Sequence, residues 1–188
     1  MVFQIIKLIS LISYPFFFLV SFSLLKLANL DSKKCSFSFL GATKPYGKFF
    51  DLNLIMAGVF QLTIFSSIYI YHLIDPTPLN IISVVFLSLT TITGILAGVI
   101  TINVSETFHI KIATVGFASS SLGWILFSLS LYKVNIYYGL LIMSLGLILI
   151  PYLTTVYKKV GDLKANYESL FFLAAYLTNL VIYMTYFA

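Results

Sequence analysis

This chain of 188 residues contains no arginine and only one cysteine. Its eleven strongly basic side chains are therefore all lysines, and the formal net charge is +5. The planar guanidinium group is the preferred tool for bidentate recognition of phosphates and bases, so its absence argues against nucleic-acid binding. Because Cys35 stands alone, the sequence also excludes an intrachain disulfide and a thiolate metal cluster.

Motifs of common catalytic and cofactor sites are missing as well. The chain has no P-loop, no dinucleotide-binding fingerprint, no Gly-x-Ser-x-Gly and no His-Glu-x-x-His. Its two histidines, His72 and His109, fall at opposite ends of the predicted bundle and cannot share a metal ion. No charged residue falls in the middle of a predicted span, which argues against a proton-coupled transporter or a voltage sensor. We therefore predict no metal and no cofactor.

Apolar side chains dominate what is present. Hydrophobic residues make up 60% of the chain and charged residues 9%, against roughly 50% and 25% in soluble domains. A soluble fold could not bury this much apolar surface, so lipid must be part of the solvent. A membrane helix needs about 20 mainly apolar residues. Six segments qualify: Leu8–Ala28, Phe50–Tyr71, Leu79–Ile102, Phe108–Leu131, Ile136–Tyr157 and Ser169–Phe187.

Short polar connections separate most of these segments, which makes consecutive helices antiparallel neighbours. The first apolar run is longer than the hydrophobic region of a cleaved signal peptide, so we interpret it as a retained span. The sequence thus predicts an all-α polytopic membrane protein, with residues 1–188 forming one compact antiparallel bundle of six transmembrane helices.

Lysines are distributed unevenly between the two ends of this bundle. We call the end that holds the first, third and fifth connections side B. It carries nine lysines: Lys26, Lys33, Lys34, Lys44, Lys48, Lys111, Lys158, Lys159 and Lys164. The other end has only Lys7 and Lys133. The positive-inside rule then predicts a multi-pass protein of the cell membrane, with loops 29–49, 103–107 and 158–168 cytoplasmic and both termini outside. A glycosylation sequon at Asn103 favours the reverse orientation, but so short a pattern carries less weight than the lysine asymmetry.

Most polar side chains that could do chemistry also fall on side B, where three predicted helices begin. We expect them to form a vestibule covered by the loop Cys35–Asn53. The candidates for the vestibule or its lid are Ser38, Gly41, Asp51, Asn53, Glu106, His109 and Glu168. Within this set, His109, Asp51 and Glu168 are the candidates for catalysis. Acidic residues at these positions are also typical of first-turn side chains that only complement the helix dipole.

Three motifs occur in order along the chain: SFLG (Ser38–Gly41), FDLNLIMAG (Phe50–Gly58) and GVITINVSETFH (Gly98–His109). In these motifs the sequence resembles the family called domain of unknown function 998, whose six-span members look distantly related to the Frag/DRAM/Sfk group. The resemblance implies a six-span fold and selects Ser38, Leu40, Gly41, Phe50, His109 and Glu168. The chain departs from the family pattern at Phe39, Asp51 and Thr101, where the family has Asp, Asn and Pro. The family has no established biochemical activity, so the resemblance implies no function.

Three functions stay open from the sequence. The leading prediction is a non-enzymatic membrane protein whose vestibule engages lipid headgroups or a partner subunit. The lysines expected at the headgroups are Lys33, Lys34, Lys158 and Lys159. The alternative is a membrane-embedded enzyme for a lipid-linked substrate, with His109 as acid or base and Asp51 or Glu168 orienting it. A small-solute transporter comes third, because it needs a polar path through the bundle. The mid-span polar side chains available for such a path are Gln61, Thr90, Thr91, Thr93, Ser119, Ser120 and Ser121.

Overall fold

The computed structural model of the chain describes residues 2–71, 77–160 and 164–186, and within these ranges the regular structure is entirely helical. The predicted polar residues His72, Asp75 and Asp162, and the side chain of Lys7, lie outside the described part. The helices are α1 (Val2–Leu27), α2 (Phe37–Gly41), α3 (Gly47–Tyr71), α4 (Pro78–Val99), α5 (Glu106–Leu131), α6 (Ile136–Ser144), the π-helical turn η1 (Leu145–Leu149), α7 (Ile150–Val160) and α8 (Ala165–Tyr186).

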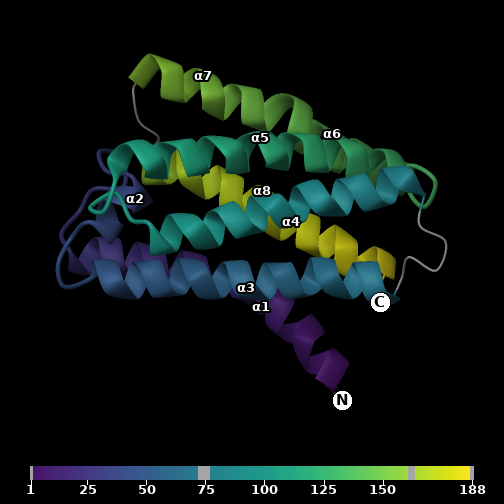
Figure 1. The fold of residues 1–188 in the computed structure, drawn as a ribbon, viewed down its shortest axis with the longest axis horizontal. Helices are drawn as coiled ribbons and strands as arrows, with labels where there is room; N and C mark the ends of the chain where they lie inside the picture. The colour runs from purple at the N-terminus through teal and green to yellow at the C-terminus, as the bar shows by residue number, and fades with distance from the viewer. Residues whose placement is uncertain (1, 72–76, 161–163, 187–188) are drawn as a thin grey trace.

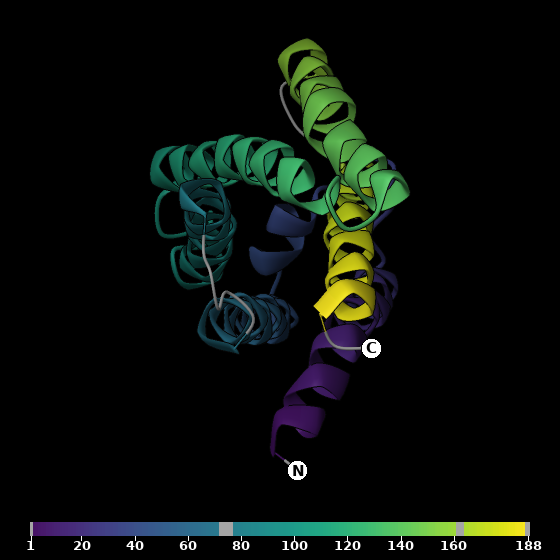
Figure 2. The same cartoon turned by 90° about the vertical axis from the view of Figure 1, so that its right-hand side faces the viewer.

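The long helices follow one another around the molecule. Helix α3 packs against α1 and α4, α4 packs against α5, and α8 returns to lie against α1. The α6–η1–α7 segment lies on the outer side of α5, and α7 projects away from the other helices (Figure 2). The short helix α2 sits at the end of the bundle where α3 and α5 begin (Figure 1). Side chains of α3, α4, α5 and α8 line two cavities within this arrangement.

Five helical segments among the described residues are long and apolar enough to cross a membrane. They are Gly47–Ser66, Pro78–Val99, Glu106–Leu131, Ile136–Lys159 and Ala165–Thr185. Helix α1 contributes a shorter apolar stretch, Leu11–Leu27, so six spans are not confirmed. By length and composition the chain is a multi-pass helical membrane protein.

Several predicted bounds need correction. Helix α3 begins at Gly47 rather than Phe50, and α8 begins at Ala165 rather than Ser169. An apolar-run criterion discards both extensions because they contain Lys48 and Glu168. The sequence prediction also missed α2, a five-residue helix whose N-cap is Ser36.

Polar caps explain where the other helices start. The side chains of Thr77, Ser105 and Asn135 accept hydrogen bonds from backbone N–H groups in the first turns of α4, α5 and α6, respectively. Such caps satisfy donors that have no partner inside the helix. Helix α1 ends at Leu27, and Asn29 just after it adopts the left-handed backbone conformation (φ 53°). Asparagine tolerates this conformation better than most residues do.

The π-helical turn in the fifth long segment has a local cause. Pro151 lies two residues after η1 and has no N–H to donate to the preceding turn. A wider turn keeps the proline ring away from the carbonyl four residues earlier, and π-bulges are a known adjustment of this kind.

Two apolar clusters hold the bundle together. The larger joins α3, α4, α5, α6, α7 and α8 around the only tryptophan, Trp124, which is 3% exposed. The smaller lies nearer side B, where α1, α2 and α3 meet α8, and contains the aromatic rings of Phe17, Phe37, Phe50 and Phe172. Phe37 thereby anchors α2 in the bundle.

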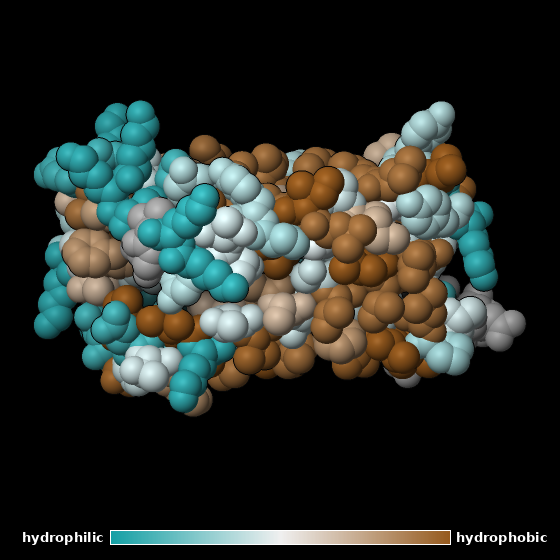
Figure 3. Space-filling model, turned by 90° about the horizontal axis from the view of Figure 1, so that it is seen from above, coloured by the Kyte–Doolittle hydropathy of each residue, from teal (hydrophilic) through white to brown (hydrophobic). Residues whose placement is uncertain are grey.

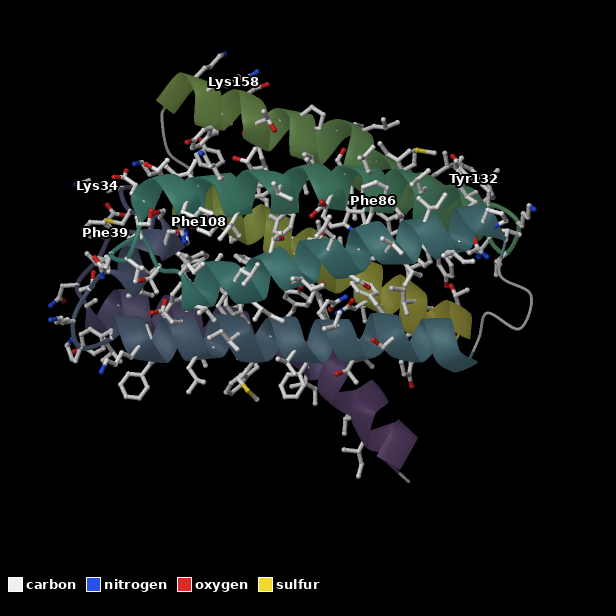
Figure 4. All side chains as sticks on the ribbon, viewed as in Figure 1. Lys34, Phe39, Phe86, Phe108, Tyr132 and Lys158 are labelled. Atoms are coloured by element: carbon white, nitrogen blue, oxygen red, sulfur yellow. The ribbon has the colours of Figure 1, made fainter. Side chains whose placement is uncertain are left out.

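Hydrophilic side chains gather at one end of the molecule, the end that carries α2, whereas apolar side chains cover the middle of the face in Figure 3. Lys34 and Lys158 lie at this end, and Tyr132 lies at the opposite end (Figure 4). The side-B lysines that the structure describes are Lys26, Lys33, Lys34, Lys44, Lys48, Lys111, Lys158, Lys159 and Lys164. Except for Lys164, they are exposed. The two ends of the helices therefore differ in polarity as the sequence predicts.

Candidate functional site

The helices line a partly open cavity of about 120 Å³ at side B, which we call the side-B cavity. Most of its wall is apolar and comes from α2, α3, α4, α5 and α8. Four of the predicted site residues line it together: Ser38, Asp51, His109 and Glu168. The structure thus brings side chains from four separate helices to the wall of one cavity.

His109 makes two hydrogen bonds in this cavity although it is only 7% exposed. Its Nδ1 atom lies 2.9 Å from the carbonyl oxygen of Ile100, and its Nε2 atom lies 3.0 Å from Ser38 Oγ. A carbonyl oxygen can only accept, so Nδ1 must carry the proton that it donates. In the neutral imidazole, Nε2 is then the acceptor and the Ser38 hydroxyl is the donor. The ring is held at both nitrogens in one tautomer.

Local structure at the start of α5 sets the direction of this ring. Residues Ile100 to Ser105 form a tight connection in which the Val104 N–H donates to the Thr101 carbonyl at 2.9 Å. Ser105 then caps α5 by accepting from the Phe108 N–H. His109 lies one turn into the helix, so its side chain reaches back toward the end of α4 and the Ile100 carbonyl.

Ser38 is held in position by the loop around α2. The Ser36 side chain caps α2, and the Phe37 N–H donates to the Glu168 carboxylate at 2.5 Å. Two backbone bonds join this loop to the start of α8, from Ala165 N–H to the Cys35 carbonyl at 2.8 Å and from Asn166 N–H to the Ser32 carbonyl at 3.3 Å. Glu168 therefore connects α8 to the loop, while Ser38 is the loop residue that reaches His109.

Asp51 lies in the first turns of α3 and also faces the side-B cavity. Its side chain shares this cavity wall with His109. Gly41 leaves room for it, since a Cβ atom at Gly41 would come within 2.8 Å of Asp51 Oδ1. Among the described residues, no group of three or more His, Cys, Asp and Glu side chains could hold a metal ion.

The other predicted site residues lie outside the cavity wall. The Asn53 amide points to α1, where it donates to the Phe17 carbonyl at 3.2 Å and to Ser21 Oγ at 3.4 Å. Glu106 is exposed in the first turn of α5. Phe39 is 49% exposed on the outer surface at side B (Figure 4).

A second cavity of about 70 Å³, the inner cavity, adjoins the side-B cavity deeper in the bundle. The two share part of their walls, namely Leu54, Thr90, Gly94, Phe171 and Phe172. Gly94 leaves this junction open, because a Cβ atom there would meet nothing within 4 Å. The two cavities are therefore neighbours with mainly apolar walls: the first holds the Ser38–His109 pair, and the second lies deeper among the helices.

An amide pair lies beside the inner cavity. Gln61 of α3 lines the inner cavity and exchanges two hydrogen bonds of 2.6 Å with Asn179 of α8. Gln61 is 3% exposed and Asn179 is 2% exposed. The sequence analysis did not select Asn179. An amide inside an apolar helix, with a second amide at matching depth in another span, is the signal that could have found it.

The direct partner of His109 also differs from the predicted one. The enzyme alternative predicts a carboxylate that orients the imidazole, whereas the described hydrogen bonds join it to a backbone carbonyl and a serine hydroxyl. Charge complementarity favours a carboxylate, but the turn before α5 brings the Ile100 carbonyl to Nδ1 first. Asp51 lines the same cavity as the ring.

These features define a class: a multi-pass helical membrane protein with an apolar interior cavity that opens among polar side chains at its lysine-rich end. A narrower assignment does not come from comparison, since no protein-family model, curated protein or solved structure matches the chain.

Proposed function

We propose that this integral membrane protein binds an amphipathic lipid. The acyl chain of the lipid occupies the side-B and inner cavities, and the anionic headgroup of the lipid lies among the side-B lysines. The observation that carries the proposal is the adjacency of the two cavities, which share five wall residues and are lined mainly by apolar side chains. Ligand sites of this form, apolar with a few convergent polar groups, occur commonly between the helices of bundles.

The charge of side B supports an anionic headgroup. By sequence this end carries nine lysines and five acidic residues, and nine minus five gives a net charge of +4. A juxtamembrane lysine near an anionic surface is worth about 1 kcal/mol. Of the two carboxylates in the cavity wall, Glu168 accepts a hydrogen bond from the Phe37 N–H, which turns one oxygen toward the loop.

The mid-span polar groups support lipid binding over solute transport. Ser120 Oγ donates to the Gly116 carbonyl at 2.8 Å, Thr91 Oγ1 donates to the Leu87 carbonyl at 3.1 Å, and Gln61 pairs with Asn179. Polar groups that bond within and between helices serve packing in a bilayer. A transport path needs such groups to face water.

Orientation and family remain part of the proposal. We propose that side B is cytoplasmic, on the lysine asymmetry. We also propose membership of the domain of unknown function 998 family, on the motifs Ser38–Gly41, Phe50–Gly58 and Gly98–His109.

Native mass spectrometry of the full chain, purified in mild detergent, tests lipid binding. Gly94→Leu fills the junction of the cavities without a backbone clash at its Cβ, so we expect it to remove the retained lipid. Ala118→Leu is the matched control, because it adds the same side chain on an exposed position of α5 and should retain lipid. Equal retention by wild type and Gly94→Leu would contradict the proposed site.

The headgroup is tested by a second variant in the same measurement. Replacing Lys33, Lys34, Lys158 and Lys159 with Gln should lower the retention of anionic lipids while neutral lipids stay bound. Unchanged retention of anionic lipids would show that these lysines do not select the headgroup.

A further inference from the structure

We propose that Ser38 is a nucleophile, that His109 is its general base, and that the pair transfers the acyl group of an ester-linked lipid. This inference rests on the proposed function, because the lipid bound in the cavities is the source of the ester. The inference is based on geometry: the Ser38 hydroxyl and the His109 ring form a hydrogen bond of 3.0 Å in the wall of a mainly apolar cavity.

The hydrogen bonds of His109 leave its Nε2 lone pair directed at Ser38 Oγ. Because Nδ1 donates to the Ile100 carbonyl, the neutral ring accepts at Nε2. A general base must lie within about 2.6–3.2 Å of the heavy atom whose proton it abstracts. The distance of 3.0 Å from His109 Nε2 to Ser38 Oγ meets this condition. The Ile100 carbonyl holds the ring as the third group of a nucleophile–base–orienter arrangement does.

The surroundings suit a change of charge on His109. When Nε2 takes the Ser38 proton, the ring becomes a cation in a site that is only 7% exposed. Asp51 lines the same cavity as the ring. A negative charge near an imidazolium stabilises it, so Asp51 is a positioning residue that acts through His109.

The position of the pair also fits the ester of a bound lipid. Ser38 and His109 lie in the side-B cavity, and the inner cavity extends away from them into the bundle. A lipid with its headgroup among the side-B lysines and its chain in the inner cavity has its ester bond between these regions. This is where Ser38 Oγ lies.

The reaction balances with water as the second substrate. Ser38 Oγ bonds to the ester carbonyl carbon and passes its proton to His109 Nε2, while the carbonyl electron pair moves to the carbonyl oxygen. Collapse of this intermediate breaks the bond to the alcohol, which takes the proton from Nε2 and leaves. Water then loses a proton to Nε2 and attacks the carbonyl carbon of the acyl-serine, which forms a second tetrahedral intermediate. When this intermediate collapses, its bond to Ser38 Oγ breaks and that proton returns from Nε2 to Ser38 Oγ. The products are a fatty acid, an alcohol and unchanged enzyme.

A fluorophosphonate probe tests the nucleophile on the full chain in lipid nanodiscs. We expect an adduct on Ser38, located by peptide mass spectrometry of the wild-type protein, so the assignment does not depend on the folding of a variant. Ser38→Ala should remove the adduct. Ser144→Ala is the control, since the Ser144 hydroxyl is exposed and donates to the Leu141 carbonyl of its own helix.

His109→Gln separates a base from a structural partner. The amide of Gln can still hydrogen bond with Ser38 but cannot take a proton, so we expect the labelling rate to fall about 100-fold or more. If the pair only fastens the α2 loop, labelling of Ser38 is absent in the wild type or is unchanged by this substitution.

Native mass spectrometry of the same samples distinguishes the two proposals. A Ser38 adduct in a protein that retains lipid, slowed in His109→Gln, supports the inference. Retained lipid without a Ser38 adduct overturns the nucleophile and leaves lipid binding intact. A Ser38 adduct in a protein that retains no lipid overturns the lipid ester as substrate.

Discussion

The Gln61–Asn179 pair offers a measurable test of how the bundle is closed. Both amides are buried, and each donates one hydrogen bond of 2.6 Å to the other. Gln61→Leu replaces the Gln61 amide with an apolar side chain and removes both hydrogen bonds. It leaves Asn179 Oδ1 and the Asn179 Nδ2–H group without the hydrogen-bond partner that each has in the wild type.

The expected magnitude follows from this geometry. An orphaned buried polar group costs about 1–3 kcal/mol, so each single substitution to Leu should lower the free energy of unfolding by that amount. The double substitution removes the orphan together with its partner and should cost less than the sum. Hydrogen bonds between membrane helices average ~0.6 kcal/mol in double-mutant cycles, so two bonds predict a coupling energy of about 1 kcal/mol.

Trp124 supplies the signal for this assay. It is the only tryptophan, is 3% exposed and lies 5.7 Å from the Phe171 ring of α8, measured between ring centroids. Its fluorescence during unfolding in mixed micelles of increasing SDS content reports the stability of each variant. Thr114→Val is the control, because this exposed hydroxyl bonds only within α5 and its loss should change stability by less than about 0.5 kcal/mol. Additivity of the two Leu substitutions within about 0.3–0.5 kcal/mol would refute the coupling.

Two further predictions concern helix packing and orientation. Gly116→Ala should be less stable than Gly94→Ala by about 1–3 kcal/mol in the same unfolding assay. A Cβ at Gly116 would come within 2.6 Å of Thr93 Oγ1, whereas one at Gly94 meets nothing within 4 Å; equal stabilities would contradict the close α4–α5 contact. The single cysteine, Cys35, should react with a membrane-impermeant maleimide only after cells are permeabilised, with protein denatured in SDS as the control for access. Labelling of intact cells would place side B outside.

The sequence predicted the coarse architecture because the signals for it are local. Apolar runs separated by polar connections gave helices whose bounds match the structure within a few residues at α4 and α5. The alternation of antiparallel spans was enough to bring Ser38, Asp51, His109 and Glu168 to the same end. Odd-numbered connections fall at one end of the bundle and even-numbered ones at the other, so the end on which a residue lies follows from the order of the spans. No knowledge of helix packing is needed.

The sequence did not predict the contacts that depend on more than the order of the spans. Helix α2 is too short to show a period, and it depends on the burial of Phe37 and on the Glu168 contact rather than on its own propensity. The His109 partner depends on a turn geometry before α5, and the Gln61–Asn179 pair depends on how α3 and α8 are rotated. Contacts of this kind arise only when the helices are packed.

Photo-crosslinking tests the central claim, lipid within the bundle, most directly. A phospholipid with a diazirine in its acyl chain is incorporated into nanodiscs with the wild-type chain, and the crosslinked peptides are mapped by mass spectrometry. The account predicts capture at residues that line both cavities, such as Thr90 and Phe172, with loss of that capture in Gly94→Leu. Capture confined to outward-facing residues such as Val85 and Leu122, which are 58% and 46% exposed, would contradict it.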